Sequence, residues 1–157
     1  MPMPYVRVVI TLCLALLLSA QSYDMDDLDE AFGKDAIVIS ADMHACWHFD
    51  VYVASSREQL QRGLMFVRDL PEFVGMIFVY TRPSIHSMWM KNTFIPLDML
   101  FIKGDGTVSS VVADTTPHSL ESIASVEPVN FVLELNAGMT AKLAIGTSSR
   151  VLFMNLD

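Results

Sequence analysis

The sequence predicts a strand-rich α+β domain: a curled antiparallel or mixed sheet, or a small open barrel, with two short helices. Seven or so short apolar segments follow one another along the chain, and Asp105-Gly106 between two of them is a strong hairpin signal. Only two stretches have helix caps and helical spacing. With 157 residues, 52% of them hydrophobic, the chain can form one domain with a substantial core.

Strands are expected wherever apolar and polar residues alternate or an apolar run is bounded by turn residues. These segments are 37–39, 46–53, 75–80, 85–91, 97–103, 107–113, 129–135 and 151–154. In the second of them Trp47, Phe49, Val51 and Val53 alternate with more polar residues, so this face is expected to be buried.

The first helix is expected to begin at Ser55-Ser56, where a glutamate or glutamine follows each serine by three residues, and to end by about Phe66. Asn136 can cap a second short helix that runs to Leu143 and is closed by Gly146.

Residues 1–22 are expected to be a secretory signal peptide. Arg7 precedes an apolar run over 8–18, and small residues allow cleavage before Tyr23 or after Ala20. A membrane-spanning helix needs about 20 apolar residues, so no stable membrane anchor is expected after cleavage. An acidic, solvated leader then covers 23–35, and a single domain covers 36–157. The protein is therefore expected to be periplasmic or secreted.

The charge of the chain excludes some partners. Its net charge is −8, which becomes −9 once the segment that holds Arg7 and no acid is removed. An acidic surface repels nucleic acid and anionic lipid, so a small molecule or another protein is the expected partner. Cys13 leaves with the signal, so Cys46 has no internal disulfide partner and is buried, metal-bound or available to another molecule.

Polar residues are set among large apolar ones over 88–98, where Trp89, Lys91, Asn92 and Asp98 are candidates for a binding cleft. A desolvated, unpaired charge costs several kcal/mol (roughly), so Asp98 needs a cation or several donors. Lys91 and the Asn92 amide are nearest in sequence. Asp98 is either a buried structural group or part of the cleft.

Glu134 is a second carboxylate in an apolar setting, with Asn136 on its side of the strand, and both are binding candidates. Together with Asp98 it suggests acid and base roles in a hydrolase, such as cleavage of glycosidic bonds. The expected position of Glu134 is nevertheless facing solvent.

His44, Cys46 and His48 lie at alternate positions of an expected strand and could bind Zn²⁺ or copper. That spacing is wide for one ion unless a loop residue such as His118 completes the site. The alternative is an ordinary solvated strand face without a cofactor.

Four motifs in one order resemble the DUF192 family: GLMFVRDL, GMIFVY, WMKNTFIPLDMLFI and FVLELNAG. The resemblance covers 49–151, about two thirds of the chain. It implies a small strand-rich domain, often secreted in prokaryotes, with no established activity. The family usually has Gly-Asp where this chain has Ser148-Ser149, which leaves the geometry of the final turn open.

No nucleophile elbow, phosphate loop, zinc-protease motif, dinucleotide fingerprint or CxxC pair occurs in the sequence. The prediction is therefore a non-catalytic, exported accessory module that binds a small ligand or a protein. The alternatives are a hydrolase that uses Asp98 and Glu134 and a metal-binding domain.

Overall fold

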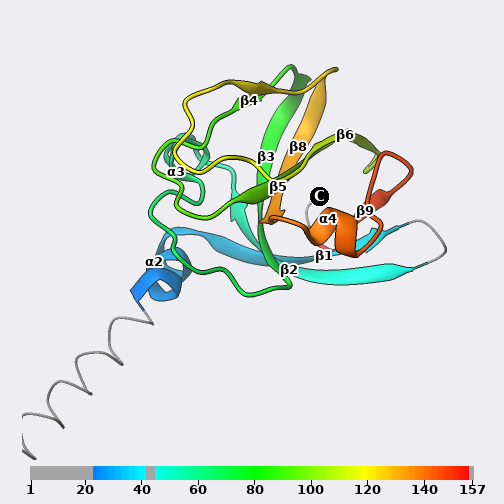
Figure 1. Ribbon diagram of the computed structural model, residues 1–157. Helices are drawn as coiled ribbons and strands as arrows, with labels where there is room; N and C mark the ends of the chain where they lie inside the picture. Colours follow the sequence, from blue (N-terminus) through cyan, green and yellow to red (C-terminus); the bar gives the residue numbers. More distant parts are fainter. Residues whose placement is uncertain (1–22, 42–44, 156–157) are drawn as a thin grey trace, which may run out of the picture.

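The computed structural model describes residues 23–41 and 45–155 (Figure 1). They form a seven-stranded mixed sheet in the order β6-β5-β8-β3-β2-β1-β9, and a two-stranded ladder of β4 and β7. Only β2 and β3 are parallel. The strands are β1 Gly33–Ser40, β2 Cys46–Ala54, β3 Val74–Ser84, β4 Ser87–Met88, β5 Leu97–Ile102, β6 Val108–Val112, β7 Ile123–Ala124, β8 Val129–Asn136 and β9 Arg150–Phe153.

The sheet is curled into a half-barrel, which brings its two edge strands, β6 and β9, close to each other. Thr107, just before β6, forms an antiparallel bridge with Arg150 of β9, and the Val151 amide donates to the Gly106 carbonyl (2.8 Å). Gly106 has φ +85°, and a Cβ there would lie 2.2 Å from the Val151 carbonyl oxygen, so only glycine allows this approach. The expected curled mixed sheet is confirmed.

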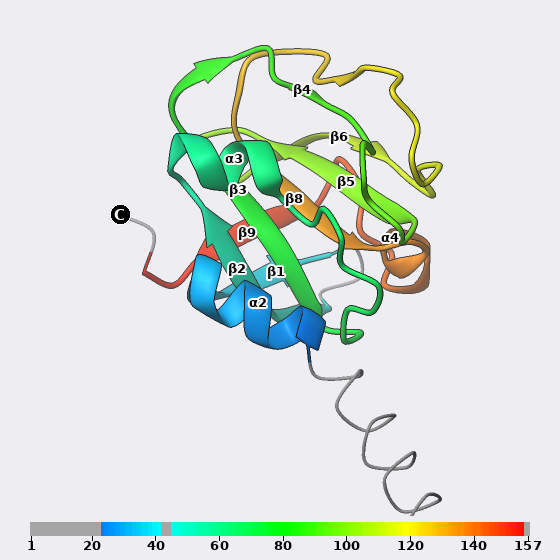
Figure 2. The same cartoon turned by 90° about the vertical axis from the view of Figure 1, so that its left-hand side faces the viewer.

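The two faces of the sheet carry separate apolar cores. The concave side holds Phe49, Ile77 and Leu133, with α4 (Met139–Lys142) closing one end. The other side holds Phe78 and Val132 and is covered by α2 (Tyr23–Ala31), α3 (Arg57–Arg62) and the segments around β4 and β7. Figure 2 shows α2 and α3 in front of β2 and β3.

The local predictions hold for most elements. Phe49 and Val51 of β2 are buried in the concave core, with Trp47 and Val53 partly buried against it. Helix α3 begins after Ser56 with the expected capping box to Gln59.

The acidic segment 23–35 differs from the solvated leader that we expected. It forms α2 and the start of β1, and Leu28 is fully buried in the core beneath α3. Two of its acids pair with distant residues or with β1: Asp29 accepts a hydrogen bond from the Tyr52 hydroxyl (2.6 Å) and pairs with Lys34, while Asp27 pairs with Arg62. The described part of the chain therefore has three helices, where the sequence predicted two.

The expected signal peptide, residues 1–22, lies outside the described residues. Among those that are described, no helix is long and apolar enough to cross a membrane.

One further segment differs from the expectation. Within 85–91 only Ser87–Met88 pairs as a strand, although Met88 and Met90 are buried and Trp89 and Lys91 are exposed, as the alternation predicts. In the final turn neither Ser148 nor Ser149 has a positive φ. The Ser149 hydroxyl accepts a hydrogen bond from the Gly146 amide (3.0 Å), so this turn does not need glycine's backbone freedom.

Candidate functional site

A pocket of about 70 Å³ lies on the convex side of the sheet, with Glu134 of β8 among its lining residues. One wall is the end of α3 and the turn after it, including Gly63 and Met65, and another is β3 with Phe78 and Tyr80. The segment 87–93 contributes Trp89 and Lys91, among others. Residues distant in sequence thus enclose one carboxyl group.

Glu134 is 4% exposed, so its expected position facing solvent is wrong. Its strand neighbours are Met76 of β3 and Met99 of β5, both fully buried. No hydrogen bond or ion pair to its side chain occurs within 23–41 and 45–155. Burial alone raises the pKa of Glu134 to about 8, because the charged form is desolvated and uncompensated.

Tyr80 stands beside this carboxyl group and is half-buried. Its hydroxyl is 3.7 Å from the Met88 sulfur, and its ring stacks on His86 with the centroids 3.5 Å apart. Desolvation and the nearby Glu134 raise the pKa of Tyr80 to about 12. The phenol therefore stays neutral and can donate to a bound molecule.

Two cationic side chains lie along the pocket, and both have other partners. The Lys91 ammonium lies 5.0 Å from the centroid of the Trp89 ring. Arg62 pairs with Asp27 and lies over the Phe32 ring at 5.4 Å. Neither supplies a counter-charge to Glu134.

Three residues in the loops near the pocket have backbone dihedral angles in the left-handed region: Phe66 (φ 69°), Asn92 (φ 56°) and His118 (φ 62°). The Phe66 amide donates to the Asn92 carbonyl (2.8 Å), and the rings of Phe66 and His118 both pack against Phe94. Such conformations are costly for Phe and His, and they persist only where the surroundings fix them. The loop that carries Trp89 and Lys91 is thus tied to the turn after α3.

Gly63 sets how closely that turn approaches the sheet. Its φ is +49°, and a Cβ would lie 2.9 Å from the Phe78 ring. Both the backbone conformation and the space therefore require glycine at this wall of the pocket.

Asp98 lies on the concave side of the sheet, where it is fully buried. One carboxylate oxygen accepts hydrogen bonds from the amides of Asp114 (2.9 Å) and Gly138 (3.1 Å). The other accepts from the Thr140 amide (2.8 Å) and hydroxyl (2.7 Å). Lys91 and Asn92 are not partners of Asp98, so that expectation is wrong. Asp98 instead joins the start of α4 and the loop after β6 to strand β5.

Asp98 and Glu134 do not form a catalytic pair. In the β5–β8 ladder Asp98 is opposite Leu135 and Glu134 is opposite Met99, and directly paired residues point to the same face of a sheet. The two carboxyl groups therefore point to opposite faces, with the sheet between them. The acid and base assignment of the hydrolase alternative has no support in this geometry.

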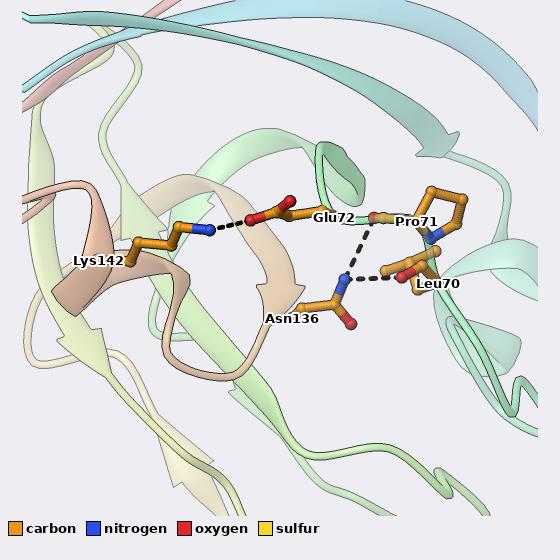
Figure 3. Close-up of polar contacts among 5 residues, drawn as sticks. All are labelled: Leu70, Pro71, Glu72, Asn136 and Lys142. Atoms are coloured by element: carbon orange, nitrogen blue, oxygen red, sulfur yellow. Dashed lines mark hydrogen bonds and ion pairs between the residues drawn. The ribbon is translucent and has the colours of Figure 1, made fainter.

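Asn136 has a structural role at the end of β8. Its side-chain amide donates to the carbonyls of Leu70 (2.8 Å) and Pro71 (3.2 Å), as Figure 3 shows. Lys142 of α4 pairs with Glu72 in the same loop. These contacts hold the connection between α3 and β3, so Asn136 is not part of the pocket lining.

Asn92 lies next to the pocket rather than in its lining, with its amide 3.9 Å from the Met65 sulfur. Of the six predicted binding residues, the structure brings together Trp89, Lys91 and Glu134.

The predicted metal ligands are only partly described. Cys46 and His48 are both exposed on β2, and His44 lies outside the described residues. His118 packs against Phe94 in the loop between β6 and β7. No group of three or more His, Cys, Asp or Glu side chains suited to a metal ion occurs within the described part of the chain.

A larger groove of about 410 Å³ lies between α2 and strands β1 and β2. Its polar groups have partners: Asp35 accepts from the Ala36 amide (2.7 Å) and the Asn155 side chain (2.8 Å), and Lys34 pairs with Asp29. It lacks an unsatisfied group comparable with Glu134.

Sequence reasoning missed Gly63, Met65, Phe78, Tyr80 and Met88 as pocket residues. The signal that could have found them is the position of the motifs. GLMFVRDL overlaps the turn after α3, GMIFVY lies on β3, WMKNTFIPLDMLFI supplies the loop before β5, and FVLELNAG contains Glu134. All four motifs contribute to one pocket.

Comparisons with known proteins agree with this fold. Residues 37–153 match the model of the DUF192 family, described as an uncharacterized ACR. A "putative transcription regulator" from Sinorhizobium meliloti 1021 is 36% identical over 78% of this chain and 95% of its own, with a TM-score of 0.76. A protein of unknown function from Novosphingobium aromaticivorans DSM 12444 is 30% identical over 74% of this chain and 83% of its own, with a TM-score of 0.72. None of the curated proteins matches the chain.

Proposed function

The chain belongs to the DUF192 family, and from that premise we propose that it is a non-catalytic, exported module that binds a small polar ligand in the pocket of Glu134. The observation that carries the proposal is the Glu134 carboxyl group, which is almost fully buried, lacks a partner within the described chain and lines a pocket. The Glu134 oxygens are not among the enclosed side-chain atoms that lack a partner, so they reach the pocket space. A ligand in the pocket can donate hydrogen bonds to them.

The size of the pocket limits what enters it. A volume of about 70 Å³ is well below the roughly 300–1,000 Å³ of sites that enclose a whole drug-sized ligand. Only the polar head of a ligand fits there, and the rest must lie outside. Trp89 and Leu120, which are 48% and 69% exposed, line an adjoining hollow of about 280 Å³ that can receive an apolar body.

A binding role fits the groups present better than catalysis does. The pocket has one carboxyl group, and Asp98 lies across the sheet. The charge of −8 also disfavours DNA, so the regulatory role in the description of the Sinorhizobium meliloti protein is not part of this proposal.

The proposal predicts saturable binding at the pocket. Four probes with one butyl stem and different heads, an amine, an amide, an alcohol and a carboxylic acid, are titrated into the purified protein and followed by amide NMR shifts. At least one should shift the signals of residues 63–65 and 87–93, and Glu134→Gln should weaken its binding at least about tenfold, the size of one lost charged contact. Glu30→Gln, the same change at an exposed site on α2, should leave binding unchanged.

Two results would contradict the binding role. Absence of any shift at these amides, or equal affinity in Glu134→Gln, would remove the pocket as the site. Turnover of glycosides or esters that Glu134→Gln abolishes while the fold remains intact would replace binding with catalysis.

Export is the second part of the proposal. It rests on the sequence, in which Arg7 precedes an apolar run over 8–18 and small residues allow cleavage before Tyr23 or after Ala20. We expect mass spectrometry of protein recovered from a bacterial periplasm or medium to give a chain that starts at or near Tyr23. Recovery of the intact Met1 form from the cytoplasm alone would contradict export.

A further inference from the structure

We propose that the head group bound beside Glu134 is a primary ammonium, carried on a short apolar or aromatic stem. This inference rests on the proposed function and names the ligand class for the same site. The buried Glu134 carboxyl has no hydrogen-bond or charged partner among the described residues, and a ligand ammonium can supply both the donors and the counter-charge that its ionised form needs.

The other charged and titratable groups around Glu134 do not supply a counter-charge to it. Tyr80 on β3 is a neutral phenol, Lys91 lies over Trp89, and Arg62 on α3 pairs with Asp27 of α2. The partner strand β5 contributes Met99, which does not titrate. Among the described residues, no cation is therefore available to pair with the ionised form of Glu134, and a ligand ammonium would be its partner.

The walls suit a small cation. The ring of Tyr80 and the thioether of Met88 lie at the pocket, and aromatic faces and polarisable sulfur tolerate a cation better than aliphatic groups do. The volume of about 70 Å³ suits a small head group such as an ammonium.

The stem has a surface to lie on outside the pocket. The adjoining hollow shares Ser87, Met88 and Trp89 with the pocket and continues to Leu120. An alkyl or aryl chain that leaves the pocket there covers the exposed Trp89 ring. The acidic charge of the protein as a whole also raises the local concentration of cations.

Binding of an ammonium is coupled to release of the Glu134 proton, whereas binding of a neutral head group is not. Below pH 8 the Glu134 carboxyl is protonated. When an ammonium binds, the carboxyl releases its proton to the solvent, and a carboxylate–ammonium pair forms. Affinity should rise about tenfold per pH unit between pH 6 and 7.5 and level off above pH 8. It should fall again near pH 10, where a primary amine deprotonates.

The test uses the full chain with n-butylamine and n-butanol as matched probes, measured by calorimetry in two buffers of different ionisation enthalpy. We expect n-butylamine to bind with release of about one proton at pH 6.5, and Glu134→Gln to lose at least about tenfold in affinity together with the proton release. Trp89→Ala should weaken binding several-fold without changing the proton release, since it removes only the stem contact.

Different failures have different meanings. If n-butanol binds as tightly as n-butylamine and its binding weakens above pH 8, the head group is not an ammonium. The pocket then remains a ligand site. Binding of n-butylamine without proton release, or equally in Glu134→Gln, would overturn the ammonium pairing. If neither probe nor the amide and acid probes shift the pocket signals, the proposed function fails as well.

Discussion

Replacement of Asp98 by asparagine is expected to lower the free energy of unfolding by about 3 kcal/mol or more. Each carboxylate oxygen accepts two hydrogen bonds, from the amides of Asp114 and Gly138 on one side and from Thr140 on the other. An asparagine NH₂ in either position faces two donors that it cannot satisfy. The residue is fully buried, so water cannot replace the lost acceptor.

Urea unfolding and thermal melts measure this loss. For a chain of this length the expected change is a drop in melting temperature of roughly 6–12 °C. Asp114→Asn is the matched control, because it removes the same charge from an exposed residue whose positive φ asparagine tolerates. A melting temperature of Asp98→Asn equal to that of the control would show that these hydrogen bonds do not hold α4 in place.

Patterns that act over short distances predicted much of the fold. The alternation along β2 placed Phe49 and Val51 in the core, and the serine at Ser56 placed the start of α3. These signals involve residues within one strand or one helical turn, so tertiary contacts need not be known.

The partners of Asp98 could not be found in the same way. The sequence showed that this carboxylate needs donors, but Gly138 and Thr140 follow it by 40 and 42 positions. Nearness along the chain favoured Lys91 instead, which lies over Trp89. A buried carboxylate can be satisfied by backbone amides alone, and residue types give no sign of those.

The burial of Glu134 escaped prediction for a different reason. The sequence placed Glu134 in an apolar setting with Asn136 on its side of the strand, but many sheet proteins carry a carboxylate on a strand face, so a solvent-facing position was expected. The tertiary structure covers the middle of this face with the turn after α3 and the loop that carries Trp89. The acidic segment 23–35 was also misread, because its few apolar side chains dock α2: Leu28 and Phe32 are buried in the core, and Met25 and Ala31 pack against it.

The buried carboxyl of Glu134 is expected to make the stability of the protein depend strongly on pH. Its pKa is about 8 in the folded protein and near 4.5 when exposed, so between these values only the folded chain holds the proton. The contribution of this group is therefore fully present below pH 4.5 and is lost as the pH rises through 8. The slope is about 1.4 kcal/mol per pH unit, so the whole change is on the order of 5 kcal/mol.

Urea unfolding of the wild type and Glu134→Gln from pH 4.5 to 9 isolates this contribution from that of the other carboxylates. Glutamine has nearly the same shape and does not titrate, so the variant should gain several kcal/mol relative to the wild type across this range. Glu30→Gln, at an exposed position, should show a nearly constant difference from the wild type. If the Glu134→Gln difference is equally constant, the carboxyl group is ionised in the folded protein near neutral pH. Such a group already has a counter-charge, and the ammonium proposal would then lose its physical basis.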